Sequence, residues 1–490
     1  MTGRVAGRRP PAWRLLGGVA ALFLVVLLVA AAGYGYHRDE LYFRLIGGHP
    51  AFGYVDQPPL VPLLDHAVDA VSGHSLVWLR VPAALAGALV VLVTGLLAAE
   101  FGAEPAAQGL AAACAGVAAI VVSAAHLATT TVFDLLAWAV LSWLVVRALR
   151  DDGPTWSFVG IAAGVSLQIK TLPVFLLFAL AVGVLVAGPR RVFASRWLWA
   201  GAAIALALWA PNLVWQATHG WPQLRLSSSI AAGDSGSSEP RIAFVPFQLV
   251  LVSPLLVPVW VTGLVRLWRD PRLATWRALA VAYPLLAVVF LAVGGKPYYL
   301  CGLYPVLLAA GCEPTLRWAR RARSRGALLV AAVALSAAVS AVLMLPVVPV
   351  GTLPSTPVVA VNYDAGETVG WPRLAATVAG VLDAQPGRPV VLAANYGEAG
   401  ALARYRPRVP VYSGHNSLWD LGPPPADTTA AVVVGYRAAT LRGWFASCRR
   451  AATVDDGVDL DNDEQDGPVF VCTGPRDGWT GLWPRLRRLG

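Results

Sequence analysis

The sequence contains few charged residues. Asp, Glu, Lys and Arg together make up 13% of its 490 residues, whereas apolar residues make up 57%. This charged fraction is about half that of soluble proteins, which argues against a soluble globular enzyme. The net charge of +10 lies in short arginine clusters between apolar runs. That pattern indicates membrane topology and argues against nucleic-acid binding.

Lysine is almost absent. Of the 38 basic residues, two are lysines, Lys170 and Lys296, and each lies at the end of an apolar segment. Because arginine serves everywhere else, a lysine at these two points indicates a need for a compact ammonium group. Chance survival of two lysines is the alternative interpretation.

Cysteine is also scarce, and no C-x-x-C spacing occurs among the five cysteines, which argues against a zinc knuckle. Cys448 and Cys472 fall in the polar C-terminal part and would form one disulfide if that part lies outside the cell. The other three, Cys114, Cys301 and Cys312, lie in or beside apolar segments, where we expect small core residues.

Long apolar runs fill the first 350 residues. The first, residues 15–32, follows Arg4, Arg8, Arg9 and Arg14 and is interpreted as a signal-anchor, with a cleaved signal peptide as the alternative. Ten further spans are predicted, of which 157–169 is the shortest. They cover residues 76–99, 106–123, 133–149, 157–169, 172–187, 197–215, 244–267, 278–293, 300–316 and 327–345.

Charge orders the loops between these spans. Arginines cluster in alternate connections, which the positive-inside rule places in the cytoplasm. With about eleven spans and a cytoplasmic N-terminus, the C-terminal region lies outside. The same arithmetic places four segments on the outer face of the membrane: residues 34–75, the 218–243 loop with its mobile part 226–240, and the turns at Lys170 and Lys296.

Composition changes after about residue 350, which predicts two domains: a transmembrane domain, 1–350, and an extracytoplasmic α/β domain, 351–490. In the second, RPVVLAANY, AAVVVGY and PVFVCTG predict strands, and GEAGALARY and RAATLRGWF predict short helices. The acidic run DDGVDLDNDEQDG lacks the twelve-residue calcium-loop pattern and is expected to be a solvated loop.

The stretch 34–62, YGYHRDELYFRLIGGHPAFGYVDQPPLVP, is the first candidate reaction site because its titratable groups lie at a membrane boundary. Asp39 and Glu40 are adjacent, so on a helix they point in different directions. We expect Asp39 to act as a base toward a hydroxyl group. For Asp56, a role as a helix N-cap is the alternative.

Two further groups complete the candidate chemistry. Asp134 lies at the entrance of a span, where a carboxylate faces either a cavity or the interface. Lys170 and Lys296 would hold a phosphate at the bilayer surface, with Tyr298 and Tyr299 adding hydroxyl donors. Snorkelling of the two lysines toward lipid headgroups is the alternative.

These motifs carry a family resemblance over nearly the whole chain. YGYHRDELYF, GYVDQPPLVPLL, HLATTTVFDLL, PNLVWQATHGWP, GGKPYYLCGLYP, ANYGEAGALARY and SGHNSLWDLGPP resemble segments of the GT-C membrane glycosyltransferases. The similarity is to the branch with bacterial aminoarabinose transferases and protein O-mannosyltransferases. It implies a polyprenyl-phosphate sugar as donor, transfer with inversion, and an acid in the first outer loop that activates the acceptor.

Carried over to this sequence, the resemblance matches Asp39 to the first-loop acid and Asp56 to the acid before the Pro-Pro step. Gln57 stands where relatives have a basic residue, and Asp134 resembles the second acid. The predicted catalytic residues are therefore Asp39, Glu40, Asp56 and Asp134. The predicted donor-phosphate residues are Arg38, Lys170, Lys296, Tyr298 and Tyr299.

The predicted function is an inverting glycosyltransferase of the plasma membrane, acting at its outer face on a lipid, glycan or protein acceptor. Candidate acceptor-side residues are His219, Trp221, Tyr396, Glu398, His415 and Asn416. A divalent metal is left open, with Asp39, Asp56 and Asp134 as candidate ligands. A sugar-lipid transporter and a non-catalytic scaffold that binds cell-wall glycan are the alternative functions.

Overall fold

The computed structural model describes residues 7–233, 241–387 and 389–490. Arg4 of the predicted N-terminal charge cluster and residues 234–240 of the predicted outer loop lie outside these ranges. The chain forms two compact units. Unit 1 comprises the chain up to Ala31, Arg80–Trp221 and Ile230–Ala341, and unit 2 comprises Ala32–Leu79, Pro222–Ser229 and Val342–Gly490.

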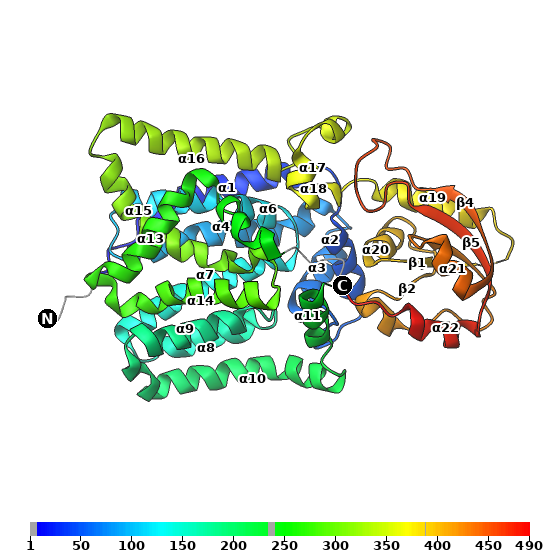
Figure 1. Cartoon of the computed structure of the whole chain (residues 1–490), viewed down its shortest axis with the longest axis horizontal. Helices are drawn as coiled ribbons and strands as arrows, with labels where there is room; N and C mark the ends of the chain where they lie inside the picture. Colours follow the sequence, from blue (N-terminus) through cyan, green and yellow to red (C-terminus); the bar gives the residue numbers. More distant parts are fainter. Residues whose placement is uncertain (1–6, 234–240, 388) are drawn as a thin grey trace. The chain divides into compact units, whose positions relative to one another are not determined.

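Unit 1 is helical throughout (Figure 1). Its longer helices are α1 (Trp13–Ala30), α4 (Leu76–Glu100), α5 (Pro105–Gly116), α6 (Ala119–His126), α7 (Thr130–Asp151), α8 (Thr155–Ser166), α9 (Pro173–Ala187), α10 (Arg196–Thr218), α13 (Val257–Arg269), α14 (Arg277–Val293), α15 (Tyr304–Ala319) and α16 (Arg323–Met344). Shorter helices between them are η1 (Arg190–Ala194), η2 (Arg241–Ala243), α12 (Phe244–Val250), η3 (Pro254–Leu256), η4 (Pro271–Trp276) and η5 (Pro297–Leu303).

Six helices of the described residues are long and apolar enough to cross a membrane, or up to eight if each of two bent pairs counts as one span. The bent pairs are Pro105–Gly116 with Ala119–His126, at 60°, and Arg241–Val250 with Pro254–Arg269, at 72°. In the apolar part of α16 only 11% of the residues are buried inside the protein, so lipid must cover the remaining apolar side chains. The chain is thus a multi-pass membrane protein, but the predicted count of eleven spans is not confirmed.

Glycines allow the helices of unit 1 to pack closely. A Cβ on Gly160 of α8 would lie 2.1 Å from the carbonyl oxygen of Gly201 in α10. A Cβ on Gly263 of α13 would lie 1.8 Å from the carbonyl oxygen of Leu307 in α15. Apolar helices in lipid associate through such close backbone contacts, because the hydrophobic effect does not drive them together there.

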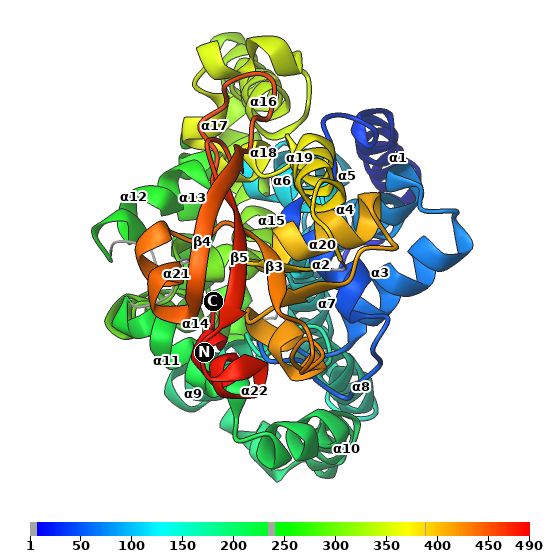
Figure 2. The ribbon, with the colours of Figure 1, turned by 90° about the vertical axis from the view of Figure 1, so that its right-hand side faces the viewer.

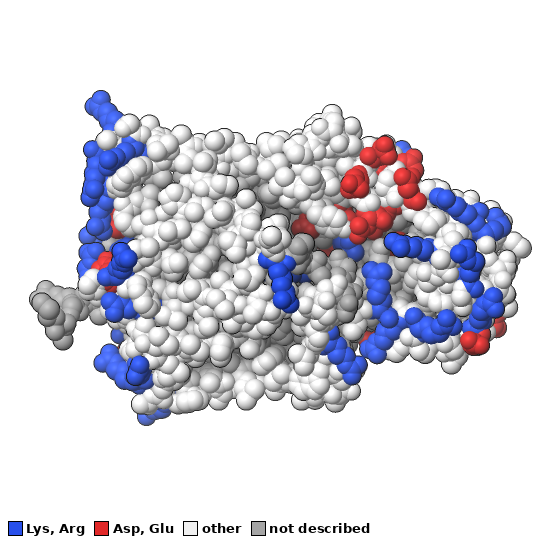
Figure 3. All heavy atoms as spheres, in the orientation of Figure 1, with Lys and Arg blue, Asp and Glu red and all other residues white. Residues whose placement is uncertain are grey.

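Arginines gather at one end of the helices of unit 1, and the flank shown in Figure 3 carries little charge. At that end the buried Glu100 pairs with Arg8, Arg147 and Arg150. Glu313 pairs with Arg317 at 3.0 Å between Oε1 and Nε. The predicted clustering of arginine in alternate loops therefore corresponds to one end of the helices, as the positive-inside rule expects for a single membrane face.

Unit 2 combines helices from the first loop with the C-terminal sheet (Figure 2). The helices are α2 (Arg38–Ile46), α3 (Leu60–Val71), α11 (Pro222–Ala232), which continues into unit 1, η6 (Val350–Ser355), α17 (Val358–Val361), α18 (Tyr363–Gly366), α19 (Trp371–Asp383), α20 (Tyr396–Tyr405), η7 (Asn416–Leu421), α21 (Ala438–Trp444) and α22 (Gly478–Leu486). Helix α20 packs on α2 with almost no space between the backbones, since a Cβ on Gly400 would lie 2.7 Å from the carbonyl carbon of Leu41. The first loop and the tail are thus one packed body.

The sheet has the strand order β2-β1-β3-β5-β4. The strands are β1 (Val390–Ala393), β2 (Val411–Ser413), β3 (Ala430–Val434), β4 (Phe445–Thr453) and β5 (Pro468–Pro475). The first three strands run parallel, whereas β5 is antiparallel to both β3 and β4. The structure confirms a small C-terminal sheet, whose core includes Val433, Phe445 and Trp479. The boundaries of the predicted domain 351–490 stay a prediction.

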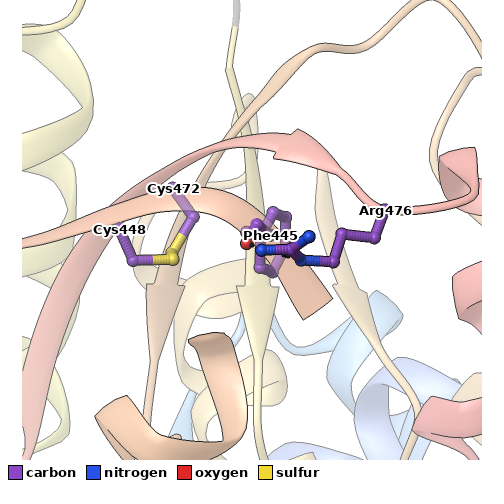
Figure 4. Close-up of a disulfide and its surroundings, with 4 residues drawn as sticks. All are labelled: Phe445, Cys448, Cys472 and Arg476. Atoms are coloured by element: carbon purple, nitrogen blue, oxygen red, sulfur yellow. Dashed lines mark hydrogen bonds between the residues drawn. A yellow bond between two sulfur atoms is a disulfide. The ribbon is translucent and has the colours of Figure 1, made fainter. Parts of the chain in front are cut away.

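A disulfide joins Cys448 of β4 to Cys472 of β5 (Figure 4), two residues that are direct partners in the ladder. Arg476 Nε donates to the carbonyl oxygen of Phe445 at 3.2 Å, beside the Phe445–Pro475 pair of the same ladder. Cys114, Cys301 and Cys312 are free and buried, as expected for small core residues.

Candidate active site

Asp39 lies in the first turn of α2, whose start is fixed by a capping box. The His37 ring accepts a hydrogen bond from the backbone N–H of Asp39 at Nδ1, 3.2 Å away, and Glu40 Oε2 accepts from the His37 backbone N–H at 2.7 Å. Glu40 is fully buried in this role. The partly exposed Asp39 points elsewhere, as expected for neighbours on a helix. A catalytic role for Glu40 stays a prediction.

Two tyrosines hydrogen-bond two of the predicted catalytic acids, Asp39 and Asp56. Tyr396 donates its hydroxyl to Asp39 Oδ1 at 2.9 Å, and Tyr42 donates to Asp56 Oδ1 at 3.0 Å. The two phenol rings pack against each other with centroids 4.7 Å apart. We call Asp39, Asp56, Tyr42 and Tyr396 the acid cluster. It brings the predicted Asp39, Asp56 and Tyr396 together within unit 2.

Asp56 lies in a loop that is bound to the segment 415–417. Ser417 Oγ accepts from the Val55 backbone N–H at 2.8 Å, and the Ser417 backbone N–H donates to Tyr42 Oη at 3.3 Å. Asn416 hydrogen-bonds the Asp56 carboxylate. Burial raises the pKa of Asp56 to about 7, although the bonds from Tyr42 and Asn416 oppose the shift. Helix α3 starts at Leu60 after Pro59, so the alternative role of Asp56 as its N-cap is excluded.

Arg38 is occupied within unit 2. Its Nη1 contacts Glu367 Oε2 at 2.8 Å and Asp463 Oδ2 at 3.1 Å, and its guanidinium lies 5.2 Å from the Tyr396 ring centroid. These contacts fix Arg38 beside the acid cluster. A phosphate-binding role for this residue stays a prediction, because its charge is already paired.

Glu398 and His415 support the start of α20. Glu398 Oε2 accepts from the backbone N–H groups of Ala394 and Asn395, and burial raises its pKa to about 7 despite these bonds. His415 Nδ1 accepts from the Tyr396 backbone N–H at 3.3 Å. Burial lowers the pKa of His415 well below its usual range, so its ring is neutral. Both residues position Tyr396.

The two lysines converge within unit 1. The Nζ of Lys170 lies 5.4 Å from the centroid of the Tyr298 ring and 5.9 Å from that of Tyr299. The Nζ of Lys296 lies 5.9 Å from the Tyr298 centroid. We call these four residues the lysine cluster. The two lysines therefore share one aromatic surface, and a phosphate-binding role for them stays a prediction.

Local structure explains how GGKPYYL presents these groups. Helix α14 ends at Gly294 in the left-handed conformation, with φ of 70°, and Pro297 then opens η5. Gln248 Nε2 donates to the Pro297 carbonyl oxygen at 2.8 Å. The Tyr299 ring rests on Phe290, with centroids 5.5 Å apart. The segment is therefore anchored on both sides of Tyr298.

Asp134 belongs to the same unit and lies within electrostatic range of Lys170. It is buried in the first turns of α7, and its Oδ1 accepts from Trp138 Nε1 at 3.2 Å. The Trp138 ring lies against Gly302, where a Cβ would come within 2.4 Å of it. Asp134 is thus buried against protein, which argues against the interface position, and its catalytic role stays a prediction.

Two predicted acceptor-side residues lie at the end of α10 in unit 1. The His219 ring stacks on Trp215 at 4.1 Å, and its Nδ1 lies 2.8 Å from the Trp215 carbonyl oxygen. Trp221 is exposed and has a φ of 58°. These contacts are local, so an acceptor role for either residue stays a prediction. Across the described ranges, no group of three His, Cys, Asp or Glu side chains could hold a metal ion.

Sequence reasoning missed Tyr42 and Ser417. Tyr42 follows Asp39 by three residues on α2, and this spacing places two side chains on one helix face. That signal was available from the sequence. Ser417 hydrogen-bonds Val55, which lies 362 residues away in the sequence, and no local sequence pattern predicts such a pairing.

A family model described as dolichyl-phosphate-mannose-protein mannosyltransferase matches residues 56–215, which include Asp56, Asp134 and Lys170. No curated protein matches the sequence.

Solved structures of other proteins share the fold of this chain. ArnT from Cupriavidus metallidurans in the apo state superposes with a TM-score of 0.61 at 16% identity, covering 94% of this chain and 98% of that one. The same protein bound to undecaprenyl phosphate gives 0.58 with the same identity and coverage. The Archaeoglobus fulgidus oligosaccharyltransferase tethered to an acceptor peptide gives 0.50 at 13% identity, covering 81% and 64%. The resemblance to the GT-C class is confirmed as a shared fold.

Proposed function

We propose that the protein is an inverting glycosyltransferase that moves a sugar from a polyprenyl-phosphate donor to an acceptor hydroxyl. The convergence of the chain's two lysines on Tyr298 carries the proposal, because it places two cations on one aromatic surface in an apolar unit. The lysine cluster, with two ammonium groups in an apolar unit, suits the phosphate of a lipid-linked sugar. ArnT, which shares the fold, was solved with undecaprenyl phosphate, and this supports a polyprenyl carrier.

The acid cluster is assigned to the acceptor. Asp39 takes the proton of the acceptor hydroxyl, whose oxygen attacks the anomeric carbon of the donor sugar. A new carbon–oxygen bond forms there while the bond to the phosphate oxygen breaks, so the configuration inverts. The phosphate leaves on the polyprenol with its negative charge balanced by Lys170 and Lys296. No side-chain nucleophile is needed for this single displacement.

The proposed orientation has the N-terminus in the cytoplasm and the domain 351–490 outside. The arginine-rich end of unit 1 supports this, since cytoplasmic loops carry the excess of positive charge (Figure 3). The Cys448–Cys472 disulfide supports it as well, because such bonds persist in oxidising compartments. Residues 1–350 are proposed as the transmembrane catalytic domain, and the acceptor is a lipid, a glycan or a protein.

The test is sugar transfer by purified protein from a panel of radiolabelled polyprenyl-phosphate sugars, with cell-envelope extract as acceptor. Asp39→Asn should lower kcat by about 10²- to 10⁴-fold and leave donor binding unchanged. Lys296→Ala should instead raise the KM for the donor. Asp427→Asn and Arg241→Ala are the matched controls, because both residues are exposed.

Right-side-out and inside-out vesicles test the proposed orientation in the same assay. Transfer to an impermeant acceptor should occur in right-side-out vesicles alone. If no donor of the panel is consumed, or if Asp39→Asn keeps full activity, the transferase mechanism is wrong.

A further inference from the structure

Tyr396 of the C-terminal tail contacts the proposed base, because its hydroxyl donates to Asp39 Oδ1 at 2.9 Å. The residue opens α20, whose start is fixed by a capping box in which Asn395 accepts from the Glu398 backbone N–H at 2.9 Å. Two capping boxes, one on α2 and one on α20, therefore set the backbone on both sides of a single hydrogen bond.

The Tyr396 ring is held on three sides. It packs on the Tyr42 ring at 4.7 Å and on the His415 ring at 4.7 Å, and the Arg38 guanidinium lies 5.2 Å from its centroid. Its backbone N–H is bound by His415 Nδ1. A phenol packed in this way keeps its hydroxyl in one place at little entropic cost, because two χ angles define it.

The direction of the hydrogen bond follows from the environment of Tyr396. Burial raises the pKa of its phenol well above 10, and the charge of Asp39 raises it further, while Arg38 opposes the shift. The hydroxyl therefore stays protonated and donates, and the carboxylate accepts.

We propose that Tyr396 is a positioning residue for Asp39: it occupies Oδ1 and so leaves Oδ2 as the oxygen that receives the acceptor's proton. This inference rests on the proposed function, and it makes the C-terminal domain a part of the catalytic centre. A general base acts only when it is held within hydrogen-bond reach of its proton, so the orientation of one carboxylate oxygen controls the rate.

Close packing between α2 and α20 gives this arrangement its rigidity. Gly400 of α20 meets the Leu41 backbone, and a Cβ on Gly397 would lie 3.0 Å from the Cβ of Arg38. Both glycines lie on the helix that carries Tyr396, and both face the helix that carries Asp39. The GEAGALARY segment thus combines the cap residue Glu398 with two contact points that tolerate no side chain.

The experiment compares Tyr396→Phe with Tyr405→Phe, which removes a hydroxyl from the other end of the same helix. With the donor that the wild type uses, Tyr396→Phe should lower kcat about ten- to hundredfold, the range expected for losing a hydrogen bond to a charged group. The KM for the donor should stay within about twofold, as expected when an interaction outside the donor site is lost. Tyr405→Phe should resemble the wild type.

A second readout needs no substrate. Carbodiimide and glycine ethyl ester at pH 6 modify accessible carboxyl groups, and peptide mass spectrometry reports the extent at Asp39. Removing the phenol hydroxyl uncovers Oδ1, so labelling should be several-fold faster in Tyr396→Phe than in the wild type and in Tyr405→Phe. If Tyr396→Phe instead loosened the fold in general, labelling would speed up at many carboxyl groups at once.

The outcomes separate the two proposals. If Asp39→Asn is inactive while Tyr396→Phe keeps both the wild-type kcat and the wild-type labelling rate, the positioning role is wrong and the transferase stands. If Asp39→Asn remains active, Asp39 is not the base and both proposals fall. A low kcat together with selective labelling of Asp39 supports the inference.

Discussion

The acid cluster and the lysine cluster are held by different forces. Each carboxylate of the acid cluster accepts a hydrogen bond from its own phenol, at 2.9 Å and 3.0 Å. The lysines instead lie over aromatic rings at 5.4–5.9 Å. Hydrogen bonds are directional, whereas a cation over a ring face keeps freedom to turn. The first arrangement suits proton transfer at one oxygen, and the second suits a phosphate whose position changes as it leaves.

The two clusters also differ in what supports them. The acid cluster depends on segments that are distant in sequence, since residues 39 and 396 are 357 positions apart. The lysine cluster depends on the ends of apolar helices and on one short 3-10 helix. Damage to the packing of unit 2 should therefore affect proton transfer, while donor binding should respond to charge and salt.

The largest effect on donor binding is expected from the lysine cluster. The double variant Lys170→Met, Lys296→Met keeps the side-chain length and removes both charges, so the apparent affinity for a polyprenyl-phosphate sugar should fall about a hundredfold, or about 2.7 kcal/mol. Donor binding by wild-type protein should also weaken with added salt, which screens exposed charges. Equilibrium binding of labelled donor in detergent measures both.

Arg241→Met is the control for that experiment, because it removes an exposed positive charge of the same unit. It should change affinity by less than a factor of two, in line with the small contributions of exposed charges. Equal losses in the control and in the double variant would mean that net charge, and not the lysine cluster, binds the donor.

The packing of α2 against α20 gives the second prediction. Gly400→Ala places a Cβ against the Leu41 backbone, so the helices must separate, at a cost of about 1–3 kcal/mol. Because Tyr396 and Asp39 lie on these two helices, kcat should fall about tenfold, and donor affinity should stay unchanged. Thermal unfolding and steady-state kinetics measure the two effects.

Gly380→Ala is the matched control, since Gly380 lies in the middle of α19 with open space around its Cβ position. Alanine favours a helix over glycine by up to about 1 kcal/mol, so this variant should be as stable as the wild type or slightly more stable. If both glycine variants behave alike, the tight contact between α2 and α20 has no role in activity.

Much of the fold could be predicted because its signals are local. The apolar runs coincide with helices or bent helix pairs, and AAVVVGY and PVFVCTG correspond to β3 and β5. Strand β4 was missed because its sequence, FASCRRAAT, carries two arginines on an exposed edge and shows no alternation. Helix α19 was missed although Gly370 and Pro372 mark its start.

The candidate site was predictable in its residue types and not in its contacts. Acids beside a membrane boundary and two rare lysines stand out from composition, because unusual residues in an apolar chain need a reason. The pairing of Asp39 with Tyr396 is set by tertiary packing between distant segments, so the sequence offers no spacing that would reveal it. Tyr42 is different, since its helical spacing from Asp39 could have been read.

The last prediction concerns the pH dependence of stability and the acid cluster. Burial raises the pKa of Asp56 in the folded protein from 3.8 to about 7. The folded state therefore binds this proton more tightly than the unfolded state does, so the stabilising contribution is complete below about pH 4. This contribution decreases as the pH rises to about 7, by less than about 1.4 kcal/mol for each pH unit. Above that pH, Asp56 adds no further pH dependence to the free energy of unfolding.

Asp56→Asn mimics the protonated form and removes this dependence. The melting temperature of the wild type relative to the variant should fall between pH 5 and pH 7 and then level off, whereas Asp427→Asn, at an exposed site, should follow the wild type throughout. Because Asp56 belongs to the acid cluster, which is assigned to the acceptor, donor binding should not follow this pH dependence in the same window. A pH response in donor binding but not in stability would reverse the contrast between the two clusters.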